Sequence, residues 1–176
     1  MSVVLAIARF LHLFLVAVLA GLLVGVALVE RALLEVGPSV YTAVQKPKHE
    51  VFAPVMPVLD TLVIAAGLLV LILMNRTRRP LAPGAVAFTA AGVVCTIALT
   101  VTTVLVNVPI NAEIIGSWSV EHPPADWAQV RDRWNLFHTI RTVVARLALV
   151  CLLVTALRPA PHGRAGTAGG RTRSGA

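Results

Sequence analysis

The chain has 176 residues, of which 57% are hydrophobic and only 13% are charged, and its formal net charge is +7. Its mean hydropathy of +0.85 excludes an ordinary soluble domain and is typical of an integral membrane protein, so the lipid bilayer is its first expected partner. We expect no nucleic-acid partner, because the basic residues flank apolar segments and do not form a separate basic surface.

Four apolar segments, at about 3–29, 53–74, 83–106 and 137–157, approach or exceed the roughly 20 residues needed to cross a bilayer. They predict an all-α protein, a four-helix transmembrane bundle formed by residues 1–157, followed by a basic, disordered cytoplasmic tail at 158–176. The first segment is about twice as long as a signal-peptide core, so we expect a retained helix. Cys95 and Cys151 lie within apolar segments and are interpreted as small hydrophobic residues.

The distribution of charge predicts the orientation. Arginines without neighbouring acids lie at the N-terminus, in the second connection and in the tail: Arg9, Arg76, Arg78, Arg79, Arg158, Arg164, Arg171 and Arg173. Acidic residues dominate the first and third connections: Glu30, Glu35, Glu50, Glu113, Glu121, Asp126 and Asp132. The positive-inside rule therefore predicts a multi-pass protein of the cell membrane with both termini in the cytoplasm.

The first helix places His12 and Glu30 on one face, since eighteen residues make about five turns. Ala17, Gly21 and Gly25 form a stripe of small residues on roughly the opposite face. Such a stripe lets another backbone approach closely. Two interpretations stay open: packing against a helix of the same bundle, or a contact that makes a homo-oligomer through Gly21 and Gly25.

The second helix is expected to follow a long outer loop from about Arg31 to Phe52. Pro54 and Pro57 would then stand in the first turn of this helix, where proline is tolerated. Asp60 would lie about one turn inside the helix, near the outer surface of the membrane.

The third helix has a polar face formed by Thr89, Thr96, Thr100, Thr103 and Asn107. Threonine hydroxyls can bond to the preceding turn of their own helix, whereas an asparagine amide needs other partners at membrane depth. Pro109 removes a backbone donor, so we expect the helix to break or kink there and to leave free backbone groups beside Asn107 and Asn111.

The fourth helix is predicted to start near Asp126, with Pro123 and Pro124 in its first turn, and to extend beyond the outer membrane surface. Five of its side chains fall within a sector of about 80°: Trp127, Arg131, Trp134, His138 and Arg141. Arg146 lies deeper and points away from this face, at a depth similar to that of His12, and it needs an acid or a wet cavity.

Polar residues of all four helices converge on the outer third of the bundle: Glu30, Asp60, Asn107, Asn111, His138 and Arg141. Because a charge that faces lipid costs several kcal/mol, we expect these groups to line one pocket with apolar and aromatic walls. The alternative is that they are ion pairs that only stabilise the bundle, such as Glu30 with Arg141. A metal ion held by Glu30 and His138 is a weaker alternative.

Three elements of the second half combine into a motif: Asn-x-Pro-x-Asn, a tryptophan, and a helix with Arg-Trp-x-x-x-His-x-x-Arg. They occupy 107–111, Trp118 and 131–141. This motif resembles the anthrone oxygenase-like family of small four-helix membrane proteins. The first helix of that family typically ends with a glycine-rich run and a glutamate, which Gly21, Gly25 and Glu30 match. One departure is Arg31, which stands where a histidine is expected and argues against a metal role at that end.

The resemblance implies a membrane-embedded oxidoreductase that oxidises a lipophilic phenolic or anthrone-like small molecule, with O2 as co-substrate and no bound cofactor. His138 would act as the base, and Arg141 with Asn111 would stabilise the oxyanion. The expected catalytic set is His138, Arg141, Asn111 and Glu30. The expected substrate-binding set is Asn107, Trp134, Trp118, Arg131 and Asp60.

Two other functions stay open. One is a non-catalytic membrane protein that binds a lipid or quinone or supports a partner complex. The other is a small transporter subunit that uses buried Glu30, Asp60 and Arg146. Transport is disfavoured because the chain has only four predicted spans and no evident inverted repeat.

Overall fold

The computed structural model describes residues 3–77 and 81–158, so the predicted tail from residue 159 onward lies outside the described residues. Within the described ranges every regular element is helical. The elements are α1 (Val3–Ala32), η1 (Leu33–Glu35), α2 (Pro38–Arg76), α3 (Ala85–Thr102), η2 (Thr103–Asn107), α4 (Val108–Ser117) and α5 (Trp127–Leu157).

Four helical stretches are long and apolar enough to cross a membrane: Val3–Glu35, Pro38–Arg76, Ala85–Ser117 and Trp127–Leu157. The prediction of an all-α bundle with four membrane-capable helices is confirmed. Large apolar side chains on the outer surface, such as Phe10, Val94 and Leu105, are well exposed, as a lipid-facing surface requires. An inner core of Val16, Leu23 and other apolar residues joins the helices.

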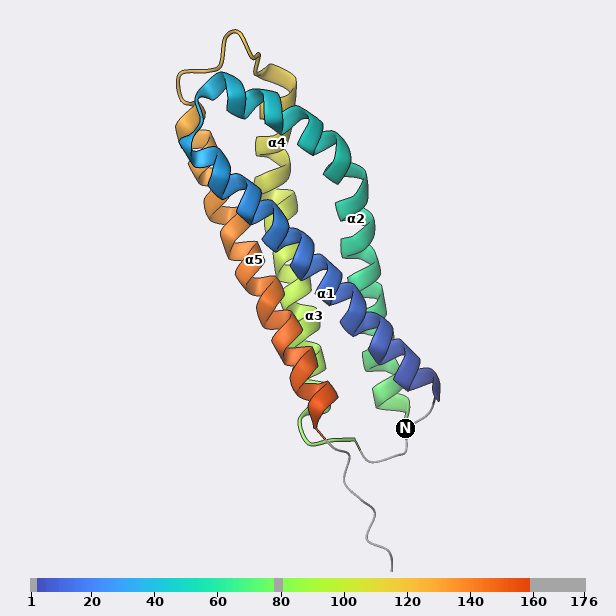
Figure 1. Cartoon of the computed structure of the whole chain (residues 1–176). Helices are drawn as coiled ribbons and strands as arrows, with labels where there is room; N and C mark the ends of the chain where they lie inside the picture. Colours follow the sequence, from blue (N-terminus) through green and yellow to red (C-terminus); the bar gives the residue numbers. More distant parts are fainter. Residues whose placement is uncertain (1–2, 78–80, 159–176) are drawn as a thin grey trace, which may run out of the picture.

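The four stretches close into a ring in which α1 and α3 each pack against both α2 and α5 (Figure 1). We call the end where α1 begins and where Arg76 and Arg158 lie the basic end. At the opposite end, the acidic end, the connection between α1 and α2 contains Glu35, and the connection between α4 and α5 contains Glu121 and Asp126.

The predicted outer loop at 31–52 is wrong, because α2 begins at Pro38 and continues through Pro47, Pro54 and Pro57. These three prolines are exposed. Proline bends a helix and frees the carbonyl four residues earlier, which an exposed side tolerates better than a packed one. In Figure 1, α2 accordingly crosses the acidic end of the bundle and then turns to run along its side.

Pro109 does not break the third stretch. The chain widens instead into the π-helical turn η2, in which the Val108 N–H bonds to the carbonyl of Thr103, and α4 follows directly. A wider turn relieves the clash between a proline ring and the preceding turn. The fourth stretch also differs from the prediction, because Pro123 and Pro124 precede α5 and do not form its first turn.

The small-residue stripe of α1 faces outward: Gly21 and Gly25 are exposed and have open space beside them. The stripe therefore does not pack within the bundle, and a homo-oligomer contact stays a prediction. His12 and Arg146 do not share a polar spot, since His12 is 1% exposed whereas Arg146 lies on the outer surface. The transporter hypothesis, which required a buried Arg146, is wrong on this point.

Candidate functional site

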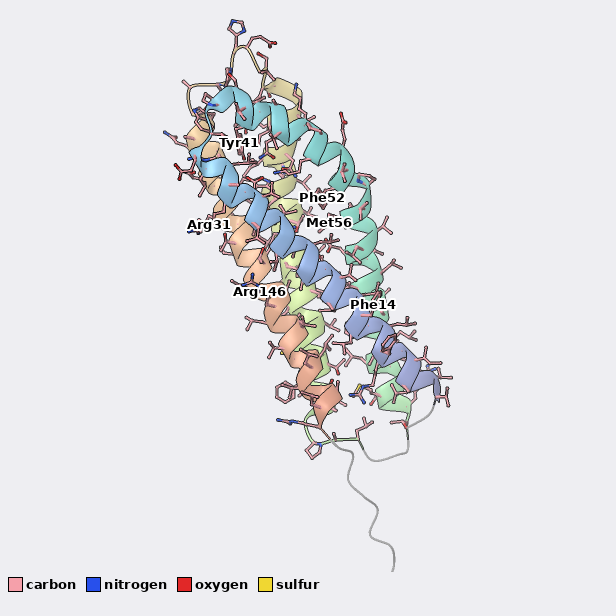
Figure 2. The ribbon with its side chains drawn as sticks, in the orientation of Figure 1. Phe14, Arg31, Tyr41, Phe52, Met56 and Arg146 are labelled. Atoms are coloured by element: carbon pink, nitrogen blue, oxygen red, sulfur yellow. The ribbon has the colours of Figure 1, made fainter. Side chains whose placement is uncertain are left out.

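A cavity of about 530 Å³ lies in the half of the bundle next to the acidic end, and side chains of all four membrane-capable stretches line it. Apolar residues such as Leu23, Met56 and Ile114 form most of its wall. A smaller polar set also lines it: Gln45, Lys48, His49, Asp60, Thr61, Thr100, Thr103, Asn111, Trp134, His138 and Arg141. In Figure 2, Phe52 and Met56 project from α2 toward α4.

His138 is held in one orientation. Its Nε2 lies 3.0 Å from the carbonyl oxygen of Leu23, and its ring stacks on the Trp134 ring at 4.8 Å with an interplanar angle of 10°. A carbonyl only accepts, so Nε2 carries the proton of the neutral imidazole. Nδ1 is buried without a hydrogen-bond partner among the described residues. The site thus leaves His138 with a free lone pair on Nδ1.

Arg141 lies about one turn further along α5 than His138, and its side chain also lines the cavity. Arg141 is 5% exposed. The carboxylate of Asp60 on α2, which is also 5% exposed, interacts favourably with the charge of its guanidinium. The Thr100 hydroxyl of α3, which also lines the cavity, donates to the Thr96 carbonyl of its own helix at 3.0 Å. The buried Nε of Arg141 has no hydrogen-bond partner among the described residues. An arginine placed this way keeps donor capacity for a ligand oxygen.

Glu30 does not pair with Arg141, so that predicted ion pair is wrong. Its Oε1 accepts from Lys48 Nζ, in an ion pair, and from Gln45 Nε2 at 3.1 Å. Lys48 Nζ also lies 4.6 Å from the centroid of the Trp134 ring. Glu30 is not among the cavity-lining residues and acts on the cavity through Lys48.

Lys48 lines the cavity and is absent from the predicted site, as are Gln45 and His49. The sequence predicts a loop at Lys48, whereas α2 places this residue at the cavity together with Gln45 and Phe52. The available signal was the spacing of Tyr41, Gln45, Lys48 and Phe52 at four, three and four residues, which is typical of one helix face. This helical spacing is hard to recognise, because two lysines and a proline interrupt the stretch.

The two asparagines have different roles. The Trp134 Nε1–H donates to Asn111 Oδ1 at 2.7 Å, which leaves the amide NH2 of Asn111 available on the cavity wall. Asn107 donates from Nδ2 to the Trp134 carbonyl at 3.3 Å and does not line the cavity. Asn107 therefore links η2 to α5 and is not part of the cavity wall, and its role in substrate binding stays a prediction.

Trp118 and Arg131 also lie outside the cavity wall. Tyr41 packs between Trp118 and Trp127, with ring centroids 6.3 and 5.9 Å away. The Arg131 guanidinium lies 4.7 Å from the centroid of the Trp127 ring and pairs with Asp132. These residues cover the acidic end of the cavity, and their predicted direct contact with substrate has no support in their positions. In the described ranges no three His, Cys, Asp or Glu side chains gather as metal ligands.

The anthrone oxygenase family model matches residues 49–151, which is more than half of the chain. The match runs from α2 into α5 and so includes Asp60, Asn111, His138 and Arg141, whereas α1 with Glu30 lies outside it. No curated protein and no solved structure gives a significant match. The combined motif of the second half was thus a correct indication of ancestry, and the chain belongs to the anthrone oxygenase family.

Proposed function

We propose that the protein is a membrane-embedded oxidoreductase that oxidises a lipophilic phenolic or anthrone-like compound with O2 in the cavity near the acidic end. One observation carries the proposal: the bond from His138 Nε2 to the Leu23 carbonyl leaves Nδ1 unprotonated and without a hydrogen-bond partner among the described residues, in a side chain that lines a largely apolar cavity. Family membership supports the same reaction class. The proposed substrate is flat and apolar, with oxygen atoms that meet the few polar groups of the wall.

The reaction begins with a proton transfer. The methylene group of an anthrone lies between two aromatic rings and opposite a ketone, so its C–H bond is acidic. His138 Nδ1 takes one proton, and the negative charge that develops moves onto the ketone oxygen. Arg141 and the NH2 group of Asn111, which line the same cavity, donate to this oxygen.

The oxidation then balances with one O2. The electron-rich carbanion reduces O2, one oxygen atom becomes the new carbonyl, and the other leaves as water with the two methylene hydrogens. His138 returns its proton to the departing oxygen, so the residue is restored for the next cycle. O2 is the oxidant, and the methylene carbon is the atom oxidised.

The proposal includes an orientation. Arg76 and Arg158 lie at one end of the bundle, while Glu35, Glu121 and Asp126 lie in the connections at the other. The positive-inside rule favours a cytoplasmic basic end. The cavity would then lie toward the non-cytoplasmic side, and the start of α5 would extend beyond the membrane surface there.

A second candidate is a non-catalytic protein that binds a lipid or quinone. The volume of about 530 Å³ and the mainly apolar wall favour it, because both suit a bound hydrophobic molecule whether or not it reacts. The two candidates differ in the need for the His138 base. A binding protein requires the shape of the cavity, whereas an oxidase requires the free Nδ1 as well.

The test is O2 uptake with 1,8-dihydroxyanthrone by the protein in lipid nanodiscs, measured against empty nanodiscs. His138→Gln should lower kcat by about 10²- to 10⁴-fold, the usual contribution of a general base. His12→Gln is the matched control, since His12 is equally buried but lines the smaller cavity and not this one. Equal O2 uptake by wild type and His138→Gln contradicts the proposal. Saturable binding without uptake above empty nanodiscs favours the binding protein.

A further inference from the structure

We propose that the cavity opens sideways into the hydrocarbon of the bilayer, through a mouth between α2 and the η2–α4 segment, and that substrate and O2 enter by this route. The nature of the substrate rests on the proposed function, whereas the lateral opening rests on geometry alone. The opening implies a substrate that is dissolved in the membrane and is not delivered from water.

The mouth is identified by residues that both line the cavity and are exposed. Pro57 and Thr61 of α2 meet this condition on one side. Val104 of η2 and Val108 of α4 meet it on the other side, and these residues are 57% and 49% exposed, respectively. The remaining walls differ, since lining residues such as His138 are almost fully buried. The cavity therefore reaches the surface of the bundle between these two segments.

The position of the mouth along the helices matches the hydrocarbon layer. At 1.5 Å per residue, Thr61 lies about 22 Å from Arg76 at the basic end, and Val104 lies about 28 Å from Ala85. The hydrocarbon core is about 30 Å thick. The Thr61 hydroxyl donates to the Pro57 carbonyl at 2.7 Å, so this polar group is already satisfied. The mouth thus presents an apolar rim at a depth where lipid, and not water, is the neighbour.

The side of the cavity that faces the acidic end is closed. Tyr41 is fully buried there, and Trp118 and Trp134 are 4% and 5% exposed within one packed apolar cluster. The ion pair of Lys48 with Glu30 adds a polar bond across the same end. A ligand from water would have to separate these contacts, whereas a ligand in the bilayer meets an opening.

The prolines of α2 give a reason for the opening. A helix bends at internal proline, and α2 crosses the acidic end before it turns along the bundle (Figure 1). Phe52 and Met56 follow this bend and project toward α4 (Figure 2). O2 dissolves better in hydrocarbon than in water, so the same opening supplies the oxidant.

A spin label tests the opening without any substrate. The label is attached at Met56→Cys, a half-buried cavity residue, in a Cys95→Ala/Cys151→Ala background reconstituted in nanodiscs. Collisions of the label with O2, which concentrates in hydrocarbon, should exceed collisions with the water-soluble nickel complex Ni-EDDA. Greater access to Ni-EDDA than to O2 overturns the proposal. A label at Ile64→Cys, another half-buried lining residue, provides a second reporter if the first variant does not fold.

A bulky residue in the mouth provides the control pair. Val104→Trp should lower O2 collisions at the label at least twofold. Val101→Trp should leave them unchanged, because Val101 is 48% exposed, precedes Val104 by about one turn and does not line the cavity. An equal response of the two variants overturns the assignment of the mouth.

Catalysis separates this proposal from the proposed function. With 1,8-dihydroxyanthrone, Val104→Trp should lower kcat/KM about tenfold with little change in kcat, because it slows entry and not chemistry. If the label faces lipid but the wild type consumes no O2, the opening stands and the oxidase fails. If the wild type consumes O2 and Val104→Trp does not alter kcat/KM, the oxidase stands and the route is wrong.

Discussion

The two halves of the bundle each bury a histidine, yet they use it differently. In the half near the acidic end, His138 is fixed by the Leu23 carbonyl and lines a cavity of about 530 Å³ with Arg141 and Lys48. In the half near the basic end, His12 lines a cavity of about 230 Å³ and packs against Gly67. The difference shows that a buried histidine alone does not define a site. A fixed tautomer, a second charge and room for a ligand are needed together.

The basic half resembles a packed core in its other polar groups. The Thr89 hydroxyl bonds to the Ala85 carbonyl of its own helix, and Arg9 donates to the Thr155 carbonyl. Such bonds satisfy polar groups locally. In the other half, Arg141 Nε and His138 Nδ1 remain buried without hydrogen-bond partners among the described residues. His12 Nε2 in the basic half is also buried without a partner among those residues, so the two halves differ in the cavity: in the acidic half, two such groups belong to side chains that line the larger cavity.

The largest expected effect tests whether the closed end depends on its ion pair. Lys48→Met leaves Glu30, which is 2% exposed, without its cation. Breaking a buried pair from one side costs about 3–5 kcal/mol of unfolding free energy. The measurement is thermal or denaturant unfolding in detergent. Lys48→Met/Glu30→Gln should recover most of the loss, and a fully additive double mutant would show that the two residues are not coupled.

The second prediction compares two arginines of α5. Arg141→Gln should lower kcat for anthrone oxidation by about 10²- to 10³-fold, because it removes an oxyanion donor. Arg146→Gln, a substitution of the same kind at an exposed position of the same helix, should leave kcat unchanged. Arg141→Lys retains the charge beside Asp60 and keeps the comparison valid if Arg141→Gln unfolds. Equal kcat for a folded Arg141→Gln, Arg146→Gln and wild type would remove Arg141 from the reaction.

The third prediction concerns the close packing of the basic half. A Cβ added at Gly67 would lie 2.5 Å from Val93 Cγ2 and 2.8 Å from His12 Nε2. Gly67→Ala should therefore destabilise the protein by about 1–3 kcal/mol through overpacking. Gly25→Ala is the matched control, since Gly25 has open space beside it and the change favours helix. Equal melting temperatures for the two variants would mean that the His12 region is loosely packed.

The smallest effect is expected at the cover of the acidic end. Arg131→Gln removes a cation–π contact with Trp127 and an ion pair with Asp132, whose side chain is 62% exposed. Contacts of this kind contribute about 0.5–1 kcal/mol. The free energy of unfolding should decrease by an amount within that range. The KM for anthrone should not change, because Arg131 does not line the cavity. An increase in KM would restore the role in substrate binding that the sequence suggested.

The membrane fold was predictable because it depends on local properties of the chain. A run of about 20 apolar residues crosses a bilayer almost regardless of its neighbours, so the four spans were visible in the sequence. Helical spacing placed His138 and Arg141 on one face of α5, and both line the cavity. The same spacing in the segment before Ala53 was overlooked, since Pro54 and Pro57 were placed in the first turn of the helix, which left the preceding residues to a loop.

The partners of each charge were not predictable. Glu30 was expected near Arg141, but the bend of α2 brings Lys48 to Glu30 and leaves Asp60 to interact with Arg141. The sequence also could not distinguish Asn111, whose NH2 faces the cavity, from Asn107, whose amide bonds to α5. Both residues have the spacing of a shared helix face, so only their observed hydrogen bonds to Trp134 separate their roles.

The sequence by itself determined the membrane environment, the helical class and the polar residues available near the acidic end, because hydrophobic length and helical period are properties of a segment. The tertiary structure alone decided which charges pair, which histidine nitrogen is free and where the cavity meets lipid. Those features depend on the angles between helices, and in this protein the prolines of α2 and the widened turn η2 set those angles.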